Sequence, residues 1–349
     1  MERNYSTLGK LGLLWKVRVK QLVTSITGGD RYLRLSSWLL IAIFIAFMLS
    51  LSFLFNQLFM EFLTIPVLGK YVMLQTLSLV FLSFFLLLLF SSMVTSLSTQ
   101  FMSNDLNFLF GTHLSGKVLY WMKSGEAIFH SSWMVVVFAF PILISYGHSV
   151  NSPWYYYPSA LIVLFPFVVI PYSLGSFLVN AVLFFIPIRR VRAVLVAIGC
   201  IFGIIMVYVL RLLSPELLFQ PELARNLFVD FLGTLEVGKM TGLPSYHASY
   251  FLHSLTARNF TGAGYHMAWL SGLSILSIVL LGGVAQFWYS PSWLRTQEGR
   301  PEQSRLLDIK NWSLWEIFPP AYAALFKKEV MRFLRQTAQW SQLLVLGAF

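Results

Sequence analysis

Charged residues and cysteine are scarce in this sequence. Asp, Glu, Lys and Arg together make up 11% of the 349 residues, whereas a soluble domain carries about a quarter of charged residues. The single cysteine, Cys200, excludes an intrachain disulfide and is typical of an ordinary buried thiol. The low charge therefore excludes an ordinary soluble enzyme, and the lone cysteine excludes a disulfide scaffold.

Apolar and aromatic residues make up most of the chain instead. Hydrophobic residues reach 57%, with 32 Phe and 11 Trp. A helix that crosses a hydrocarbon core of about 30 Å needs about 20 mostly apolar residues. We therefore predict an all-α, polytopic membrane protein with six transmembrane helices, at residues 38–58, 72–94, 128–146, 160–186, 193–210 and 267–287.

The basic residues indicate how these spans are oriented. Of the 25 Lys and Arg, 20 fall in the segments that lie inside if the N-terminus is cytoplasmic, and basic residues concentrate in cytoplasmic loops. The sequence therefore predicts that the N-terminus is inside. Contact of this inner face with an anionic lipid bilayer explains the net charge of +11, so no nucleic acid is needed to explain it.

The pattern divides the chain into three regions. Residues 1–36 are basic, with apolar residues at helical spacing, which predicts a cytoplasmic interfacial helix, the elbow helix. Residues 37–290 form the six-span domain, with an inner loop at 95–127 and an outer region at 211–266 that is expected to dip into the outer leaflet. Residues 291–349 are predicted to hold a cytoplasmic linker, a second interfacial helix and the start of a truncated seventh span.

The six apolar runs contain no Lys, Arg, Asp or Glu. Ion-coupled carriers usually hold ionisable groups at membrane depth, so this chain is expected to take its energy from another protein. The fourth run contains Pro166, Pro171, Gly175 and Asn180. They predict a kink or break of the kind that lines a transport path, although a lipid-facing kink explains them equally well.

The segment GTHLSGKV, residues 111–118, fits the opening of a phosphate-binding loop, G-x-x-x-x-G-K. Such a loop needs a preceding strand and a Ser or Thr after the lysine to hold Mg²⁺. Here Val118 follows the lysine, and the residues before Gly111 have the pattern of a short capped helix. We therefore expect Gly111 and Gly116 to form a turn between helices, with no bound nucleotide or other cofactor.

Three histidines of the outer region leave a membrane-embedded metalloenzyme open as an alternative. His247, His253 and His266 match no H-E-x-x-H spacing, and no cysteine accompanies them. Structural or interfacial histidines are therefore favoured, and no catalytic or metal-binding residue is predicted.

The order of these elements resembles the ABC-2 type permease fold, the membrane part of ATP-driven exporters. The stretch SNDLNFLFGTHLSGKVLYWMKSGEAIFHSSW, residues 103–133, is similar to a family of bacterial ABC exporters, and KKEVMRFLRQTAQWSQLL, residues 327–344, resembles the start of that family's second half. A further outer segment is similar to the Leu-Pro-Ser segment that such permeases carry before the sixth span: Leu243, Pro244, Ser245 and Tyr246. In that segment Trp is commoner where His247 stands here.

The resemblance implies a role for the inner loop 95–127. In ABC-2 exporters this loop is the coupling helix, which docks on a cytoplasmic ATPase subunit. Exposed apolar side chains with a few charges suit such a contact, although an amphipathic loop that lies on lipid has a similar composition. Seven residues are assigned to docking: Asp105, Leu106, Phe108, Leu109, Phe110, Leu114 and Lys117.

The leading hypothesis is therefore a multi-pass permease subunit of the cell (inner) membrane that exports an unidentified substrate. It is not expected to be an enzyme, because ATP hydrolysis is assigned to a separate ABC ATPase subunit. A second permease half would come from the same or another chain. A secondary carrier or channel not driven by ATP is the first alternative, and the metalloenzyme is the second.

Overall fold

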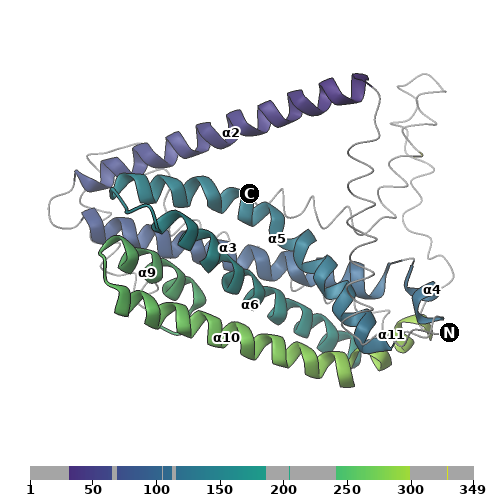
Figure 1. Ribbon diagram of the computed structural model, residues 1–349. Helices are drawn as coiled ribbons and strands as arrows, with labels where there is room; N and C mark the ends of the chain where they lie inside the picture. The colour runs from purple at the N-terminus through teal and green to yellow at the C-terminus, as the bar shows by residue number, and fades with distance from the viewer. Residues whose placement is uncertain are drawn as a thin grey trace, which may run out of the picture.

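The computed structural model describes residues 31–64, 69–103, 105–111, 115–185 and 241–298, together with the single positions 204 and 328. Every regular element in these residues is a helix, as predicted (Figure 1). The helices are α2 (Arg31–Leu63), α3 (Gly69–Phe101), α4 (Leu106–Phe110), α5 (Gly116–Ser149), α6 (Tyr156–Phe185), α9 (Pro244–Thr256), α10 (Phe260–Phe287) and α11 (Tyr289–Glu298).

Five of these helices are long and apolar enough to cross a membrane. They are residues Ala42–Leu63 of α2 and the whole of α3, α5, α6 and α10. Each overlaps one of the predicted spans, so the chain is a multi-pass membrane protein. The predicted span at 193–210, both predicted interfacial helices and the predicted start of a seventh span lie outside the described residues.

The helices on either side of the inner loop are longer than hydropathy predicts. α3 has 33 residues and α5 has 34, so at 1.5 Å per residue each is about 50 Å long, well beyond the roughly 30 Å of a hydrocarbon core. Their extra turns take up most of the predicted loop 95–127, and only residues 102–115 connect the two helices. The predicted inner loop 95–127 therefore includes the ends of both helices, because a fall in hydropathy marks the edge of the lipid and not the end of a helix.

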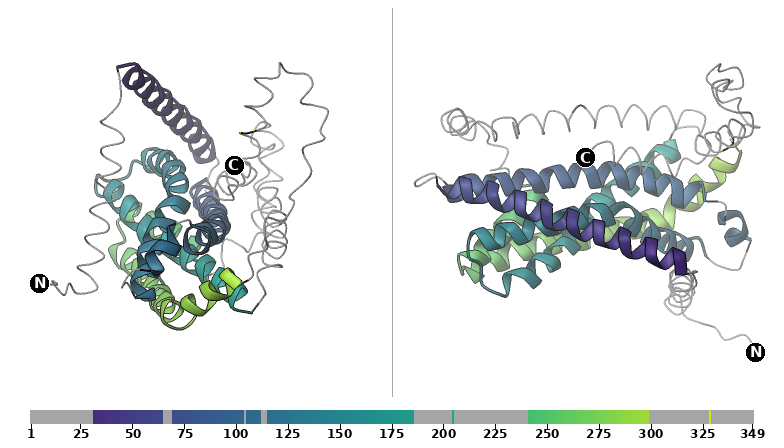
Figure 2. Two further views of the ribbon diagram at one scale, coloured as in Figure 1. Left: turned by 90° about the vertical axis from the view of Figure 1, so that its right-hand side faces the viewer. Right: turned by 90° about the horizontal axis from the view of Figure 1, so that it is seen from above.

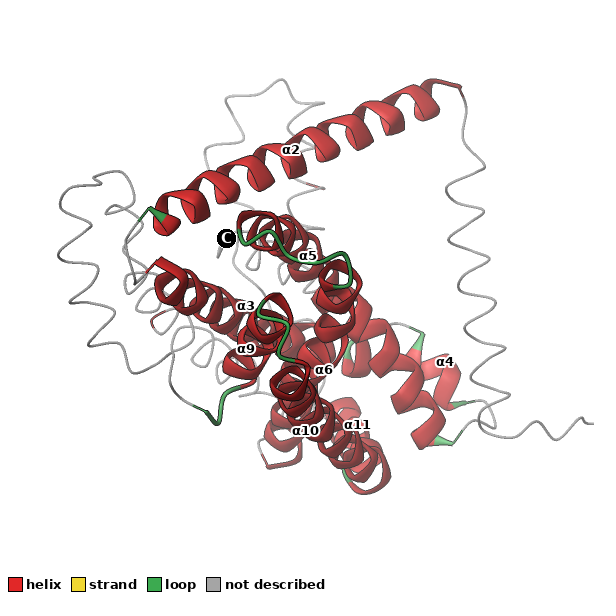
Figure 3. Ribbon diagram, turned by 60° about the vertical axis from the view of Figure 1, so that its left-hand side comes forward, coloured by secondary structure: helices red, strands yellow, loops and turns green. Residues whose placement is uncertain are grey.

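α3 and α6 lie at the centre of the bundle, between α5, α9 and α10 (Figures 1 and 3). Their close approach depends on Gly175 of α6, where an added Cβ would overlap the Ser92 hydroxyl and lie 2.9 Å from the Leu89 carbonyl oxygen. Ser92 Oγ also donates to the Pro171 carbonyl oxygen at 3.2 Å. The two helices are therefore joined by a small-residue contact and a hydrogen bond, which are ordinary means of helix association in membranes.

α6 has no break at the residues for which a kink or break was predicted. The helix continues from Tyr156 to Phe185 through Pro166 and Pro171. Both prolines, Gly175 and Asn180 are buried in the bundle, so a lipid-facing position is excluded for all four. A proline within a membrane helix removes a single backbone hydrogen bond, and packing against neighbouring helices lets the helix continue.

α2 is the least packed of the five long helices. Only 6% of its most apolar window is buried, against 72% in α3 and in α6. Its N-terminal part stands away from the other helices, while its C-terminal part lies beside α5 (Figures 1 and 2). That contact includes a 3.0 Å hydrogen bond between the Ser52 and Ser145 hydroxyls and a 3.1 Å bond from Ser149 Oγ to Asn56 Oδ1.

The two ends of the bundle hold different helix termini and connecting segments. The α4 end holds the C-termini of α3, α6 and α10, the N-terminus of α5, and the short helices α4 and α11 (Figure 1). The opposite end holds the α5–α6 connection and the turn from α9 to α10. An apolar cluster fills each half: Phe101, Tyr120 and Tyr289 belong to the one at the α4 end, and Tyr146 and Leu252 to the other.

Candidate functional site

The short helix α4 lies at one end of the bundle and has one buried and one exposed side. Leu106 is 1% exposed and packs in the same apolar cluster as Phe101 and Tyr120. Two residues later, Phe108 is 75% exposed. Since residues two apart on a helix point in different directions, one face of α4 anchors it and the other presents an aromatic ring to the surroundings.

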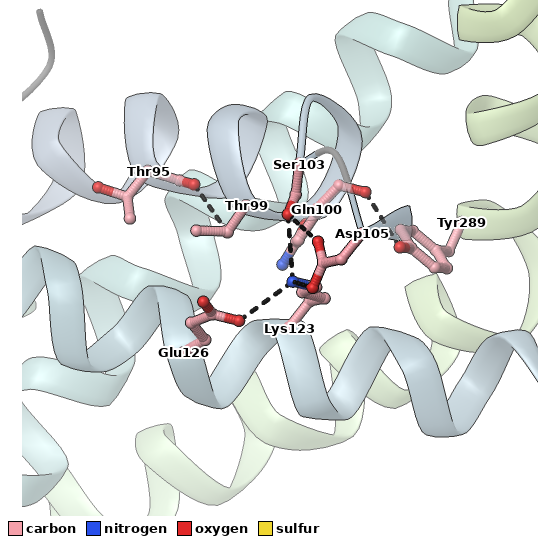
Figure 4. A network of polar contacts seen from close by, with 8 residues as sticks. All are labelled: Thr95, Thr99, Gln100, Ser103, Asp105, Lys123, Glu126 and Tyr289. Atoms are coloured by element: carbon pink, nitrogen blue, oxygen red, sulfur yellow. Dashed lines mark hydrogen bonds and ion pairs between the residues drawn. The ribbon is translucent and has the colours of Figure 1, made fainter. Parts of the chain in front are cut away.

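A buried lysine of α5 holds the start of α4 (Figure 4). Lys123 is 1% exposed, and its Nζ lies 2.7 Å from Asp105 Oδ2 and 3.2 Å from Glu126 Oε2. Nζ also donates to Ser103 Oγ at 3.2 Å. An ammonium group has three protons to donate, so these partners satisfy all of them. We call Lys123, Asp105, Glu126 and Ser103 the Lys123 cluster.

Asp105 stands at the N-cap position of α4 but does not cap it. Its side chain makes no cap hydrogen bond and instead accepts from Lys123 and from the Ser103 hydroxyl. Partial burial of the carboxyl raises its pKa, but the hydrogen bonds from Lys123 and Ser103 and the charge of Lys123 outweigh burial and bring the pKa below its ordinary value. Asp105 is therefore ionised at neutral pH.

The other end of α4 is joined to α11 by aromatic rings. Phe110 stacks on Trp293 with 3.8 Å between ring centroids, and it also contacts the ring of Tyr289 at 6.0 Å. Tyr289 is fully buried, and its hydroxyl donates to the Gln100 carbonyl oxygen of α3 at 3.0 Å. α4 is thus fixed to α5 at its start and to α11 at its end.

A buried polar network links α3, α5 and α6 next to this site. The Gln100 amide nitrogen is within 3.2 Å of the Ser124 and Ser176 hydroxyls and 3.1 Å from the Tyr172 hydroxyl. Its two protons can serve only two of these three acceptors at a time. The Tyr120 hydroxyl lies 3.1 Å from Ser176 Oγ, which extends the network. Polar side chains therefore connect the central helices close to the point where α4 is attached.

The predicted docking residues differ widely in exposure. Phe108 and Lys117 are exposed, Asp105, Leu109 and Phe110 are half-buried, and Leu106 is buried. Lys117 Nζ donates to Gln286 Oε1 of α10 at 3.2 Å. Leu114 lies outside the described residues. Leu106, Asp105 and Phe110 therefore attach α4 to the bundle. Among the six docking residues that the structure describes, only Phe108 combines an apolar side chain with high exposure.

Comparison with known families gives one match that covers most of the chain. The model of the family described as "Putative ATP-binding cassette" matches residues 31–349. The chain belongs to this ATP-binding cassette family. No curated protein and no solved structure matches it.

The family description refers to ATP binding, and GTHLSGKV is the segment of this chain that fits the opening of a phosphate-binding loop. Gly116, Lys117 and Val118 form the first turn of α5, and the element before Gly111 is the helix α4 and not a strand. A Cβ at Gly116 would overlap the Ser290 hydroxyl of α11, and Val118 is buried. A phosphate-binding loop needs a strand before it and a hydroxyl after the lysine, and the described residues provide neither. Gly111 follows α4 as a turn residue, whereas Gly116 is the first residue of α5 and not part of a turn; residues 112–114 between them lie outside the described residues.

The three outer histidines do not converge. His247 Nδ1 lies 2.9 Å from His266 Nδ1, and His247 Nε2 lies 2.7 Å from the Thr241 carbonyl oxygen. His253 contacts the Tyr146 hydroxyl instead, at 3.2 Å. Among the residues that the structure describes, no group of three or more His, Cys, Asp or Glu could hold a metal ion.

The Leu-Pro-Ser-Tyr segment forms the start of α9. Leu243 occupies the N-cap position and Pro244 the first turn, where a proline costs no hydrogen bond. Ser245 is buried, and the ring of Tyr246 stacks on Tyr250 at 4.0 Å. This segment therefore positions α9, whose later residues pack in the apolar cluster of that half of the bundle.

The sequence contained a signal for one of the residues that the prediction omitted. Leu119, Lys123 and Ala127 are four residues apart and therefore lie on one helix face, and all three are buried. A lysine in such a stripe should find carboxylate partners. Tyr289 and Trp293 gave no comparable signal, because Tyr289 meets Gln100 from 189 residues away in the sequence.

Proposed function

We propose that this chain is the membrane-spanning permease of an ATP-driven exporter of the ABC-2 type, and that a separate ATPase subunit binds at α4. The exported substrate is unidentified. The membership in an ATP-binding cassette family and the five membrane-length helices support this proposal. The proposal places the protein in the cell membrane with α4 on the cytoplasmic side, as the basic residues predict.

The observation that carries the proposal is the exposed ring of Phe108 on a firmly held helix. Its neighbours Leu106 and Phe110 are fixed in the bundle and against Trp293, whereas Phe108 is 75% exposed at the end of the bundle. Aromatic residues are enriched at the centres of protein interfaces, where a rigid ring fills a pocket of the partner. An interface on α4 therefore explains why this ring points outward.

The attachments of α4 also suit the transfer of work between subunits. An ATPase can drive a permease only if its nucleotide states bind two permease conformations with different free energies. α4 is joined to α3 by the chain, to α5 through Lys123 and to α11 through Trp293. A displacement of α4 would therefore reach three helices of the bundle.

ATP hydrolysis is assigned to the partner because the segment with a phosphate-loop pattern follows the helix α4 and begins the membrane-length helix α5, with Val118 after the lysine. The proposal also includes a second permease half, from the same or another chain. The low burial of α2, 6% against 72% for α3 and α6, leaves a long apolar surface for that half or for lipid.

The test is a single substitution on the exposed face of α4. We expect Phe108→Asp to abolish co-purification of an ABC ATPase with the full chain and to remove the ATP hydrolysis of the complex, because a carboxylate cannot enter an apolar pocket. Co-purification is measured by quantitative mass spectrometry after mild solubilisation. Trp154→Asp is the matched control, because Trp154 is also an exposed aromatic, at 80%, and lies at the opposite end of the bundle.

Two results would contradict the proposal. If Phe108→Asp retains the same ATPase as the wild type, α4 is not the docking site. If the purified chain alone hydrolyses ATP, or drives transport in vesicles from an ion gradient without ATP, the protein is not a permease powered by a separate ATPase.

A further inference from the structure

We infer that Lys123 is the positioning residue that makes α4 and α5 move as one body, through its ion pair with Asp105. The attachment itself rests on the observed contacts, and only its consequence for ATP-driven transport rests on the proposed function. Lys123 is 1% exposed and is 2.7 Å from Asp105 Oδ2 (Figure 4).

The charge of Lys123 could be neutralised without Asp105. Glu126 is one turn away on the same helix, and its Oε2 is 3.2 Å from Lys123 Nζ. A buried ammonium needs a carboxylate partner, and Glu126 is one. Glu126 lies on α5 itself and cannot join it to another helix. The additional contact with Asp105 therefore connects α5 with the segment that begins α4.

Asp105 forgoes its ordinary local role for this contact. Aspartate at an N-cap position normally accepts a hydrogen bond from a backbone N–H of the first helical turn. Here the Asp105 side chain makes no such bond and is directed to Lys123 and Ser103. The capping stabilisation of α4 is thus exchanged for an attachment to α5.

The ion pair adds a second connection between α4 and α5, at the opposite end of α4 from the covalent one. The chain connects the C-terminal end of α4 to α5 through residues 111–115, and the ion pair connects its N-terminal end to α5. A short helix held at both ends cannot rotate about either connection. Without the ion pair, the buried Leu106 and the Phe110–Trp293 stack would still hold α4 against the bundle. The polar connection between the start of α4 and α5 would be lost, so a force applied at Phe108 would act less directly on α5.

The attachment is tested in the purified full chain in nanodiscs by hydrogen exchange of the backbone amides of residues 106–110. We expect the double variant Asp105→Asn with Lys123→Met to raise exchange there by at least about tenfold, because α4 opens without unfolding the bundle. Amides in the central parts of α3 and α6 should stay as protected as in the wild type. Lys70→Met, at an exposed lysine at the opposite end of α3, should change neither set.

The double variant is chosen because it leaves no uncompensated charge at Lys123 or Asp105. The single variants Lys123→Met and Asp105→Asn should raise α4 exchange as well, and Asp105→Asn should also lower the melting temperature because it leaves the buried ammonium with one carboxylate fewer. Unchanged α4 exchange in the double variant would overturn the inference. A uniform rise across α3 and α6 would overturn it too, since Lys123 would then stabilise the whole bundle and not position α4.

A second measurement separates this inference from the proposed function. In the complex with the ATPase, we expect the double variant to retain co-purification, because Phe108 is intact, and to lose the change in ATP hydrolysis rate that the permease causes. If no ATPase binds even the wild type, the proposed function fails, and the exchange experiment still decides the attachment. If the ATPase binds and the permease effect on hydrolysis is unchanged in the double variant, the role of Lys123 in coupling is wrong.

Discussion

At the scale of single residues, His247 is a buried side chain whose proton positions are set by its partners. The Thr241 carbonyl can only accept, so His247 Nε2 carries a proton and its Nδ1 accepts from His266 when both rings are neutral. A further proton on His247 would force His266 to change tautomer. Two charged rings could not keep this contact, because both Nδ1 atoms would be donors.

These contacts predict a pH dependence of stability. Burial lowers the pKa of His247 below its ordinary value of 6.5, although the Thr241 carbonyl acts in the other direction. The folded state therefore takes up a proton less readily than the unfolded state, so the stability is complete above about pH 6.5 and falls as the pH drops below that value. We expect the melting temperature to fall by about a few degrees between pH 7.5 and 5.5, as measured by scanning fluorimetry.

The variants His247→Gln and His253→Gln identify the source of this dependence. His253 is half-buried, and its pKa is also lowered by burial and by Lys70, but its contact is Tyr146. His247→Gln should lower the melting temperature at pH 7.5 and reduce its change with pH, and His253→Gln should leave the larger part of that change. An unaltered pH slope in His247→Gln would contradict the assignment.

The surroundings of two predicted docking residues, Asp105 and Lys117, differ in the structure. Asp105 and Lys117 were both predicted as charges for a partner, from a pattern of residue types. In the structure Lys117 is exposed, whereas Asp105 pairs with Lys123. Sequence alone could not separate these two, since the orientation of Asp105 is decided by a lysine 18 positions later in another helix.

At the scale of helices, the contact between α3 and α6 makes a sharp prediction. We expect Gly175→Ala to destabilise the protein by roughly 1–3 kcal/mol, because the new methyl group would meet Ser92 Oγ and the backbone of Leu89 and Met93. The backbone atoms of α3 cannot move aside as a side chain can. The melting temperature and the yield of monodisperse protein in detergent measure this effect.

Gly272 in α10 provides the matched control. A Cβ at Gly272 would meet no atom within 4 Å, and alanine stabilises a helix interior relative to glycine by about 1 kcal/mol. Gly272→Ala should therefore be neutral or stabilising. If both alanine variants behave alike, helix propensity and not the contact with Ser92 determines the effect at Gly175.

The existence of these helices could be predicted, but their ends could not. Hydropathy located the five described spans because each must present apolar side chains to lipid or to the bundle. It missed the polar turns of α3 around Gln100 and of α5 around Lys123, which are buried by contacts with other helices. The prolines of the fourth run predicted a kink or break, and α6 has no break there; sequence does not reveal that α3 packs against that part of α6.

At the scale of the whole molecule, the two ends of the bundle are expected to face different compartments. The α4 end carries Lys117, Lys123 and Arg295, and the C-termini of α3, α6 and α10 lie there. The opposite end carries the exposed ring of Trp154 on the α5–α6 connection. An ATPase that uses cytoplasmic ATP can reach α4 only if the first of these ends is inside, so orientation and function are linked.

Cysteine labelling can determine this orientation. In a Cys200→Ser background, Trp154→Cys and Asn107→Cys place one thiol at an exposed position of each end. We expect a membrane-impermeant maleimide to label Trp154→Cys in intact cells, or in spheroplasts if an outer membrane is present, and Asn107→Cys only after permeabilisation, because basic segments stay on the cytoplasmic side. Labelling is read as a gel shift, with Cys200→Ser alone as the blank. The reverse pattern would place α4 outside, where no cytoplasmic ATPase could bind it, and would reject both the N-inside topology and docking at Phe108.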